Sequence, residues 1–121
     1  TWTKYDGFKS EHCDFGNFIM RGWMRKKVNE NNFFTLEKFP KRYFLMNFNS
    51  ADLQIAHSPG EIGRQTNKNT FPTNNILTPC IFEERLPSQV PIWLQNKNKA
   101  SDYDLFTVTR EERDMWMNGF R

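Results

Sequence analysis

The chain has 121 residues, of which 37% are hydrophobic and 19 are aromatic (12 Phe, 4 Trp and 3 Tyr), and its net charge is +3. This length fits one compact domain, and the aromatic content excludes a wholly disordered chain. No segment has the roughly 20 consecutive apolar residues of a membrane-spanning helix, and no secretion signal is recognisable.

The beginning of the chain does not have the pattern of a regular element. Because the first residue is Thr1 rather than Met, we expect a fragment or processed form, with any lipidation signal upstream. Residues 1–17 mix aromatic and polar side chains without a sustained period, and Gly7 and Gly16 interrupt them. We therefore expect an N-terminal extension over 1–17, able to pack on a domain that comprises residues 18–121.

The domain begins with β-strand patterns. Residues 18–28 are apolar and β-favouring with a basic end, and they predict a first strand. A long, partly apolar loop over 29–40 follows. Residues 41–48 and 51–57 predict a hairpin, and 58–75 predict a long connection with one short strand.

The second half of the chain predicts short strands and then a helix. The strands are expected at 76–77, 80–82, 90–95 and 103–108. The run Thr109-Arg110-Glu111-Glu112 has the spacing of a capping box, in which the threonine side chain and the Glu112 carboxylate each cap the other's backbone N–H. Met115, Trp116 and Phe120 supply the helix with a core-facing side. The pattern favours a β-barrel or sandwich with one C-terminal helix.

Two strand motifs and the helix tryptophan resemble the pleckstrin-homology (PH) family over about residues 18 to 120. The motifs are Gly22-Trp23-Met24-Arg25-Lys26 and Lys41-Arg42-Tyr43-Phe44-Leu45-Met46, and Trp116 falls where the family keeps its helix tryptophan. The resemblance implies a mainly β fold, a two-sheet antiparallel barrel of about seven strands capped by one C-terminal α-helix.

The same resemblance implies a site for a lipid headgroup at the open end of the barrel. Many PH domains bind phosphoinositides through a lysine late in the first strand and a basic-x-Arg triplet, which correspond to Lys26 and Arg42. The first basic position of the triplet is Pro40, so one expected ligand is missing. Independently, Met24 and Lys26 share one face of a strand, so a core position for Met24 directs Lys26 to the barrel mouth and directs Arg25 and Lys27 outward.

The candidate headgroup-binding residues are therefore Lys26, Arg42, Arg25, Lys27 and Lys41. An arginine fork and a lysine charge suffice for one phosphomonoester but are few for three phosphates. The alternative is that these residues are solvated charges at strand ends, above all Arg25, Lys27 and Lys41. Arg64 and Lys68 are open candidates to complete the site.

The loop at 29–40 is the expected membrane-inserting segment. Phe33, Phe34 and Leu36 can enter the interface while nearby cations hold anionic lipid. The alternative is that one or two of these side chains fold back onto the barrel wall.

The Asn- and Lys-rich loops and the length are similar to acylated PH proteins of apicomplexan parasites. This similarity implies a cytosolic protein held peripherally on secretory organelles called micronemes by an acylated N-terminus outside this chain. There it would sense phosphatidic acid, a single phosphomonoester, and support exocytosis. The alternatives are a phosphoinositide-binding adaptor and a protein-interaction module of the same fold.

Other classes of function lack their motifs. No nucleophile elbow or phosphate-cradling glycine loop is present, so we expect no enzyme, and Cys13, Cys80, His12 and His57 lack metal-ligand spacing, so we expect neither metal nor cofactor. The two cysteines are expected to be separate thiols. A concentrated basic face with exposed aromatics is missing, so we expect no nucleic-acid partner. We expect a monomer whose partners are anionic phospholipid and the membrane surface.

Overall fold

The computed structural model describes residues 7–26, 40–62, 70–72, 76–77, 89–96 and 99–120. These ranges contain nine β-strands, one short 3-10 helix and one α-helix. The strands are β1 (Phe8–Lys9), β2 (Cys13–Gly16), β3 (Ile19–Lys26), β4 (Lys41–Asn47), β5 (Asp52–Ala56), β6 (Thr70–Pro72), β7 (Ile76–Leu77), β8 (Gln89–Asn96) and β9 (Lys99–Phe106). The 3-10 helix η1 spans Pro59–Glu61, and the helix α1 spans Arg110–Phe120.

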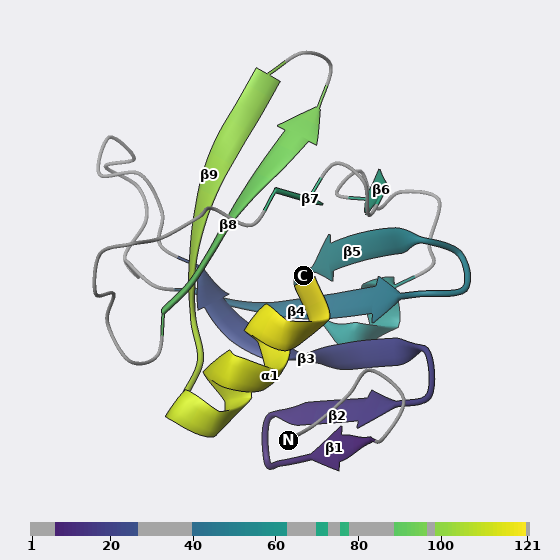
Figure 1. Ribbon diagram of the computed structural model, residues 1–121, viewed down its shortest axis with the longest axis vertical. Helices are drawn as coiled ribbons and strands as arrows, with labels where there is room; N and C mark the ends of the chain where they lie inside the picture. Colours follow the sequence, from purple (N-terminus) through teal and green to yellow (C-terminus); the bar gives the residue numbers. More distant parts are fainter. Residues whose placement is uncertain are drawn as a thin grey trace.

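Seven of these strands form one antiparallel path in the order β6-β5-β4-β3-β9-β8-β7. The path bends at β3 and β9, which within the described residues share the pairs Arg25↔Phe106 and Lys26↔Leu105. Figure 1 shows β8 and β9 running across the direction of β2 to β5, with α1 packed beside them. This arrangement confirms the expected mainly β fold with a C-terminal helix.

The strands β1 and β2 are an addition that the sequence did not predict. They lie within the expected extension, and β2 pairs with the first half of β3 from Cys13↔Gly22 to Gly16↔Ile19. The burial of β2 alternates, with Cys13 and Phe15 each 2% exposed. The described part of residues 1–17 therefore supplies both a sheet edge and part of the hydrophobic core.

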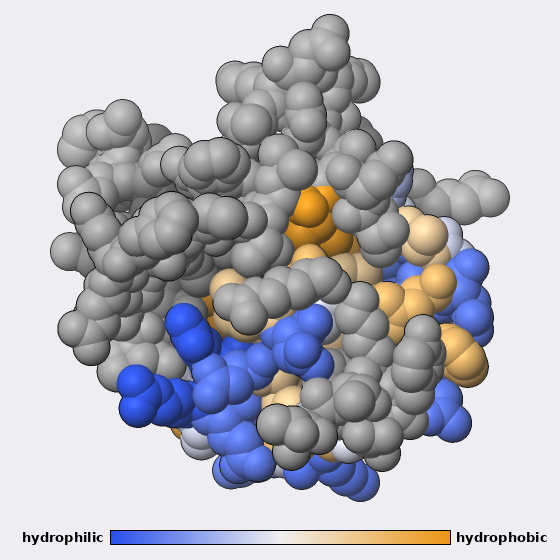
Figure 2. Space-filling view, viewed as in Figure 1, coloured by the Kyte–Doolittle hydropathy of each residue, from blue (hydrophilic) through white to orange (hydrophobic). Residues whose placement is uncertain are grey.

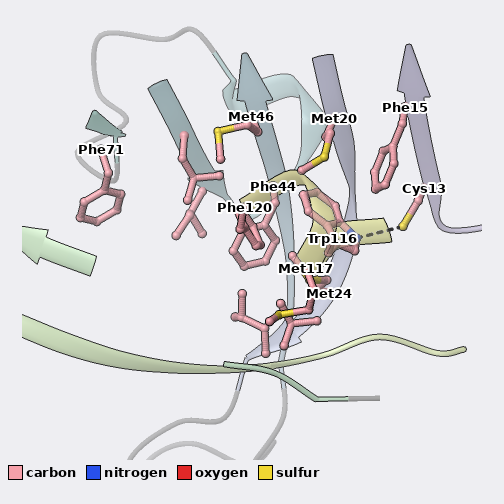
Figure 3. Close-up of a cluster of buried hydrophobic side chains, with 14 residues drawn as sticks. Cys13, Phe15, Met20, Met24, Phe44, Met46, Phe71, Trp116, Met117 and Phe120 are labelled. Carbon is pink, nitrogen blue, oxygen red and sulfur yellow. Dashed lines mark hydrogen bonds between the residues drawn. The ribbon is translucent and has the colours of Figure 1, made fainter. Parts of the chain in front are cut away.

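The core lies between the bent sheet and α1, with Trp116 at its centre (Figure 3). This indole is fully buried and lies edge-on to Phe15, with ring centroids 4.9 Å apart, and stacked on Phe120 at 5.6 Å. The sheet contributes alternate residues of each strand because successive side chains point to opposite faces. The remaining members of the buried cluster are Cys13, Met20, Met24, Phe44, Met46, Leu53, Ile55, Phe71, Val90, Leu105 and Met117.

The start of α1 differs in one respect from the predicted capping box. The Thr109 hydroxyl accepts a hydrogen bond of 3.2 Å from the backbone N–H of Glu112, as expected. The Glu112 carboxylate does not reach back to Thr109; it accepts a 2.7 Å hydrogen bond from the hydroxyl of Ser10 instead. The prediction of a reciprocal box was wrong because the β1–β2 hairpin places a competing donor beside this carboxylate.

The surface of α1 is polar on the side that faces solvent. Its exposed residues include Arg110, Glu111 and Asp114, and Figure 2 shows hydrophilic surface over the beginning of the helix. Among the described residues, no helix has the length and apolar character needed to cross a membrane.

Candidate functional site

Lys26 and Arg42 continue the core-facing rows of their strands. In β3 the buried residues Met20 and Met24 share this face with Lys26, and in β4 the buried Phe44 shares it with Arg42. Lys26 and Arg42 themselves are half-buried. Both cations therefore lie at the end of the core, where β3 ends and β4 begins, on the left of Figure 1.

The register of β3 and β4 places the two cations close together, because Arg42 pairs with Met24 and Lys26 lies two residues further along the same face of β3. Burial lowers the pKa of the Lys26 ammonium, and the positive charge of Arg42 lowers this pKa further. The Arg42 guanidinium donates a 2.7 Å hydrogen bond through Nη1 to the backbone carbonyl of Lys41, which fixes its orientation. An anion bound between the two side chains would relieve both the repulsion and the loss of hydration.

Pro40 occupies the position where a third cation was sought. Its side chain is buried, and its carbonyl accepts a 3.0 Å hydrogen bond from the backbone N–H of Lys26. This residue helps to hold β3 against the start of β4 and adds no charge. The described part of the mouth thus presents one arginine and one lysine on the core-facing side.

Arg25 and Lys41 lie on the opposite face of the same strands, where the alternation of side chains places them. They are direct cross-strand partners in the β3–β4 register. The neighbouring pair on this face, Trp23 and Tyr43, makes an edge-to-face contact with centroids 5.3 Å apart. Of the proposed cations that the structure describes, Lys26 and Arg42 therefore lie on one face of the sheet, and Arg25 and Lys41 lie on the other.

A pocket of about 160 Å³ lies beside this outer face, and its lining also includes the buried residues Met24 and Thr107. The pairing of β3 with β4 brings Trp23, Arg25 and Lys41 into its lining. His12, Phe106 and Val108 reach it from other segments of the chain. No sequence pattern groups His12, Phe106 and Val108 with the strand cations, because these three residues precede β2, end β9 and follow β9 respectively. Only the β3–β9 pairing and the added β2 strand bring them together.

Several predicted site residues lie outside the described residues. They are Lys27, Phe33, Phe34 and Leu36, together with the open candidates Arg64 and Lys68. Cys80 also lies outside, whereas Cys13 is a buried free thiol. Within the described ranges, no group of three His, Cys, Asp or Glu residues is arranged to hold a metal ion.

A bent antiparallel sheet of this strand order with one C-terminal helix on its core is a PH-like fold. The chain is similar to the solution structure of the PH domain of human oxysterol-binding protein-related protein 11, with a TM-score of 0.60 and 16% sequence identity. The alignment covers 84% of this chain and 76% of that one, and sixteen solved chains match in all. At this identity the likeness shows the fold. No family model matches the sequence, and no curated protein matches it.

Proposed function

We propose that this domain binds an anionic phospholipid at a membrane surface and holds the headgroup phosphate between Lys26 and Arg42. One observation carries the proposal. The two cations lie on the core-facing side of adjacent strands, near enough that Arg42 lowers the pKa of Lys26. Two like charges held together in a half-buried position are typical of a site for an anion.

The charge of the site favours a headgroup with one phosphomonoester, as in phosphatidic acid. The arginine fork can bind two phosphate oxygens, and the lysine adds a point charge. Because Pro40 stands where a third cation would serve a polyphosphorylated inositol, the described residues suit the smaller headgroup better.

The cellular setting is part of the same proposal. On the basis of the Asn- and Lys-rich loops, which resemble those of acylated PH proteins of apicomplexan parasites, the proposed setting is the cytosolic surface of micronemes, where the domain would sense phosphatidic acid and support exocytosis. A single headgroup site gives weak membrane binding, so a second anchor is needed, and an acylated N-terminus would supply it. Phe33, Phe34 and Leu36 are the proposed apolar contact with the membrane.

The experiment is co-sedimentation of the domain with vesicles of phosphatidylcholine alone or with added phosphatidic acid, phosphatidylserine or phosphatidylinositol bisphosphate. The vesicles are matched in surface charge, since cations near an anionic surface contribute about 1 kcal/mol each whatever the headgroup. We expect phosphatidic acid to bind best, with affinity about fivefold to tenfold lower in Lys26→Ala and Arg42→Ala. The matched control is Lys9→Ala, which removes an exposed lysine on β1.

Three outcomes would overturn the proposal in different ways. Preference for phosphatidylinositol bisphosphate would make the domain a phosphoinositide adaptor. Binding that follows surface charge alone, with Lys9→Ala as damaging as Arg42→Ala, would remove the headgroup site. Absence of binding to every vesicle would favour a protein-interaction module.

A further inference from the structure

We propose that Lys26 is a site of covalent acylation, at which its amine takes the acyl group of an acyl phosphate while Arg42 holds the phosphate. The modification would regulate membrane binding, because it removes the charge of one of the two cations in the headgroup site. This inference rests on the proposed function, since it uses the same pair of side chains. It concerns a chemical reaction of Lys26 rather than reversible binding of a lipid.

The strand register brings the two side chains within reach of one small molecule, where β3 ends and β4 begins (Figure 1). Because Arg42 pairs with Met24, Lys26 is its diagonal neighbour on the same face of the sheet. Diagonal neighbours lie about 7 to 8 Å apart, and long side chains span this separation. In an acyl phosphate a single oxygen separates the phosphorus from the carbonyl carbon. A phosphate on Arg42 therefore places this carbon beside the Lys26 amine.

Hydrogen bonds hold both strand ends in this arrangement. The backbone N–H of Lys26 donates a 3.0 Å hydrogen bond to the carbonyl of Pro40, which fixes the end of β3 against the start of β4. Nη1 of Arg42 donates to the carbonyl of Lys41. The guanidinium has further N–H donors on Nη2 and Nε, and these can bind the phosphate of the acyl donor.

The surroundings of Lys26 favour its uncharged amine, which is the form that attacks a carbonyl group. The side chain is half-buried, and burial is the larger cause of its lowered pKa, with the charge of Arg42 as the second cause. Burial continues to act when a phosphate neutralises Arg42. A lysine that is partly desolvated beside another cation is typical of an activated nucleophile.

The reaction needs no other reactant. The Lys26 nitrogen forms a bond to the carbonyl carbon, and the bond between this carbon and the phosphate oxygen breaks. The phosphate leaves with the proton of the amine as hydrogen phosphate, and nothing is oxidised or reduced. Arg42 stabilises the negative charge that develops on the leaving phosphate. The amide that forms on Lys26 is uncharged, so Arg42 alone would remain to hold a lipid headgroup.

The test treats the whole chain with acetyl phosphate and measures acetylation of each lysine by mass spectrometry. N-succinimidyl acetate, an acetyl donor without a phosphate, is the comparison reagent, and the exposed Lys9 and Lys41 are internal controls. Acetylation of Lys26 relative to these two lysines should be about fivefold higher with acetyl phosphate than with the comparison reagent. Arg42→Ala should remove this difference, and circular dichroism shows that the variant is folded. Dihexanoyl phosphatidic acid should slow acetylation of Lys26 but not of Lys9.

The effect on membrane binding is measured with the same treated protein. The acetylated wild type should bind phosphatidic acid vesicles about fivefold to tenfold more weakly than the untreated wild type, because one of the two cations has lost its charge. Lys26→Arg is the matched variant, since its guanidinium does not take the acetyl group. Treatment with acetyl phosphate should leave the vesicle affinity of Lys26→Arg at its own untreated value.

The possible results separate this inference from the proposed function. If Lys26 shows no preference for acetyl phosphate over the exposed lysines, the acylation site is wrong, whatever the vesicle assay gives. If Lys26 reacts preferentially with both reagents and Arg42→Ala changes neither preference, the assignment of an acyl phosphate is overturned. If Lys26 is acetylated selectively and vesicle binding does not change, the acylation site stands and the proposed headgroup role of Lys26 is overturned.

Discussion

The indole N–H of Trp116 donates a hydrogen bond of 3.2 Å to the sulfur of Cys13, which joins residues 103 positions apart in the sequence (Figure 3). Trp116 lies in α1 and Cys13 in β2, and both side chains are buried. This contact ties the C-terminal helix to the strand that precedes the PH-like path. The stability of the domain should therefore depend on residues before β3.

Cys13 should make the domain less stable at alkaline pH. Burial raises the pKa of its thiol from 9.0 to about 11. A raised pKa in the folded state means that the stabilisation is fully present below pH 9 and is lost as the pH rises through about 11. The free energy of unfolding should fall by about 2 to 3 kcal/mol across this window. Urea denaturation at pH 8 and at pH 10.5 measures most of this loss.

Cys13→Ala is the control for this pH dependence. Burial also raises the pKa of Tyr43, so part of the alkaline loss of stability belongs to that residue and persists in the variant. The difference between the two proteins gives the contribution of the thiol, including the smaller effect of its charge on the pKa of Tyr43. An equal loss of stability in the wild type and in Cys13→Ala would show that the thiol ionises as easily in the folded state as in the unfolded chain.

The hydrogen bond between Ser10 and Glu112 should make a second contribution from the N-terminal strands. The Glu112 side chain is 2% exposed, one of its carboxylate oxygens has no partner, and the other accepts from Ser10. Ser10→Ala would leave a buried carboxylate without that donor and would also remove the oxygen that accepts from the backbone N–H groups of His12 and Cys13. It should therefore lower the free energy of unfolding by about 1 to 3 kcal/mol. Urea denaturation measures this loss.

Ser50→Ala is the matched substitution for Ser10→Ala, because Ser50 is an exposed residue of the turn after β4. It should change the free energy of unfolding by less than about 0.5 kcal/mol. Equal effects of the two substitutions would mean that the Ser10–Glu112 hydrogen bond adds nothing measurable to stability.

The sequence predicted the parts of the molecule that depend on long or well-marked local patterns. The strand at 41–48 and the helix after Thr109 are confirmed by β4 and α1. The alternation of Met24 and Lys26 also predicted correctly that Lys26 continues a core-facing row, because a strand's period of two fixes the face of every residue. Lys26 and Arg42 could therefore be grouped from the sequence.

The strands β1 and β2 could not be predicted in the same way. They have two and four residues, so the alternation in Cys13-Asp14-Phe15-Gly16 covers only two periods and does not stand out from chance. β9 also begins at Lys99, four residues before the predicted strand, because pairing with β8 extends it through a polar stretch. The outer pocket depends on β2 and on the pairing of β3 with β9, and neither of these had a local signal.

Gly22 should be required by the close passage of β2. A Cβ atom at this position would lie 2.7 Å from the carbonyl oxygen of His12 and 2.8 Å from Cα of Cys13, which are backbone atoms that cannot turn aside. Gly22→Ala should therefore lower the free energy of unfolding by about 2 to 3 kcal/mol. Gly16→Ala is the control, since a Cβ there meets nothing within 4 Å. Thermal and urea denaturation of both variants measure the difference, and a stable Gly22→Ala protein would contradict the close β2–β3 packing.

The pKa of Lys26 should rise when Arg42 is removed. Burial is the larger cause of its lowered pKa, and the charge of Arg42 is the second. In Arg42→Ala the pKa should therefore move up towards 10.5 but stay below it. Bound phosphate in the wild type should also raise the pKa of Lys26. The contribution of Lys26 to binding should then be complete below the pKa of the free protein and be lost as the pH rises through the pKa of the bound protein.

Titration of the Lys26 ¹³Cε signal by NMR measures the pKa of Lys26 in each case. Lys9→Ala, which removes a charge on β1, should leave the pKa of Lys26 unchanged. A Lys26 pKa that is the same in Arg42→Ala and the wild type would separate the two cations and remove the basis for a shared anion.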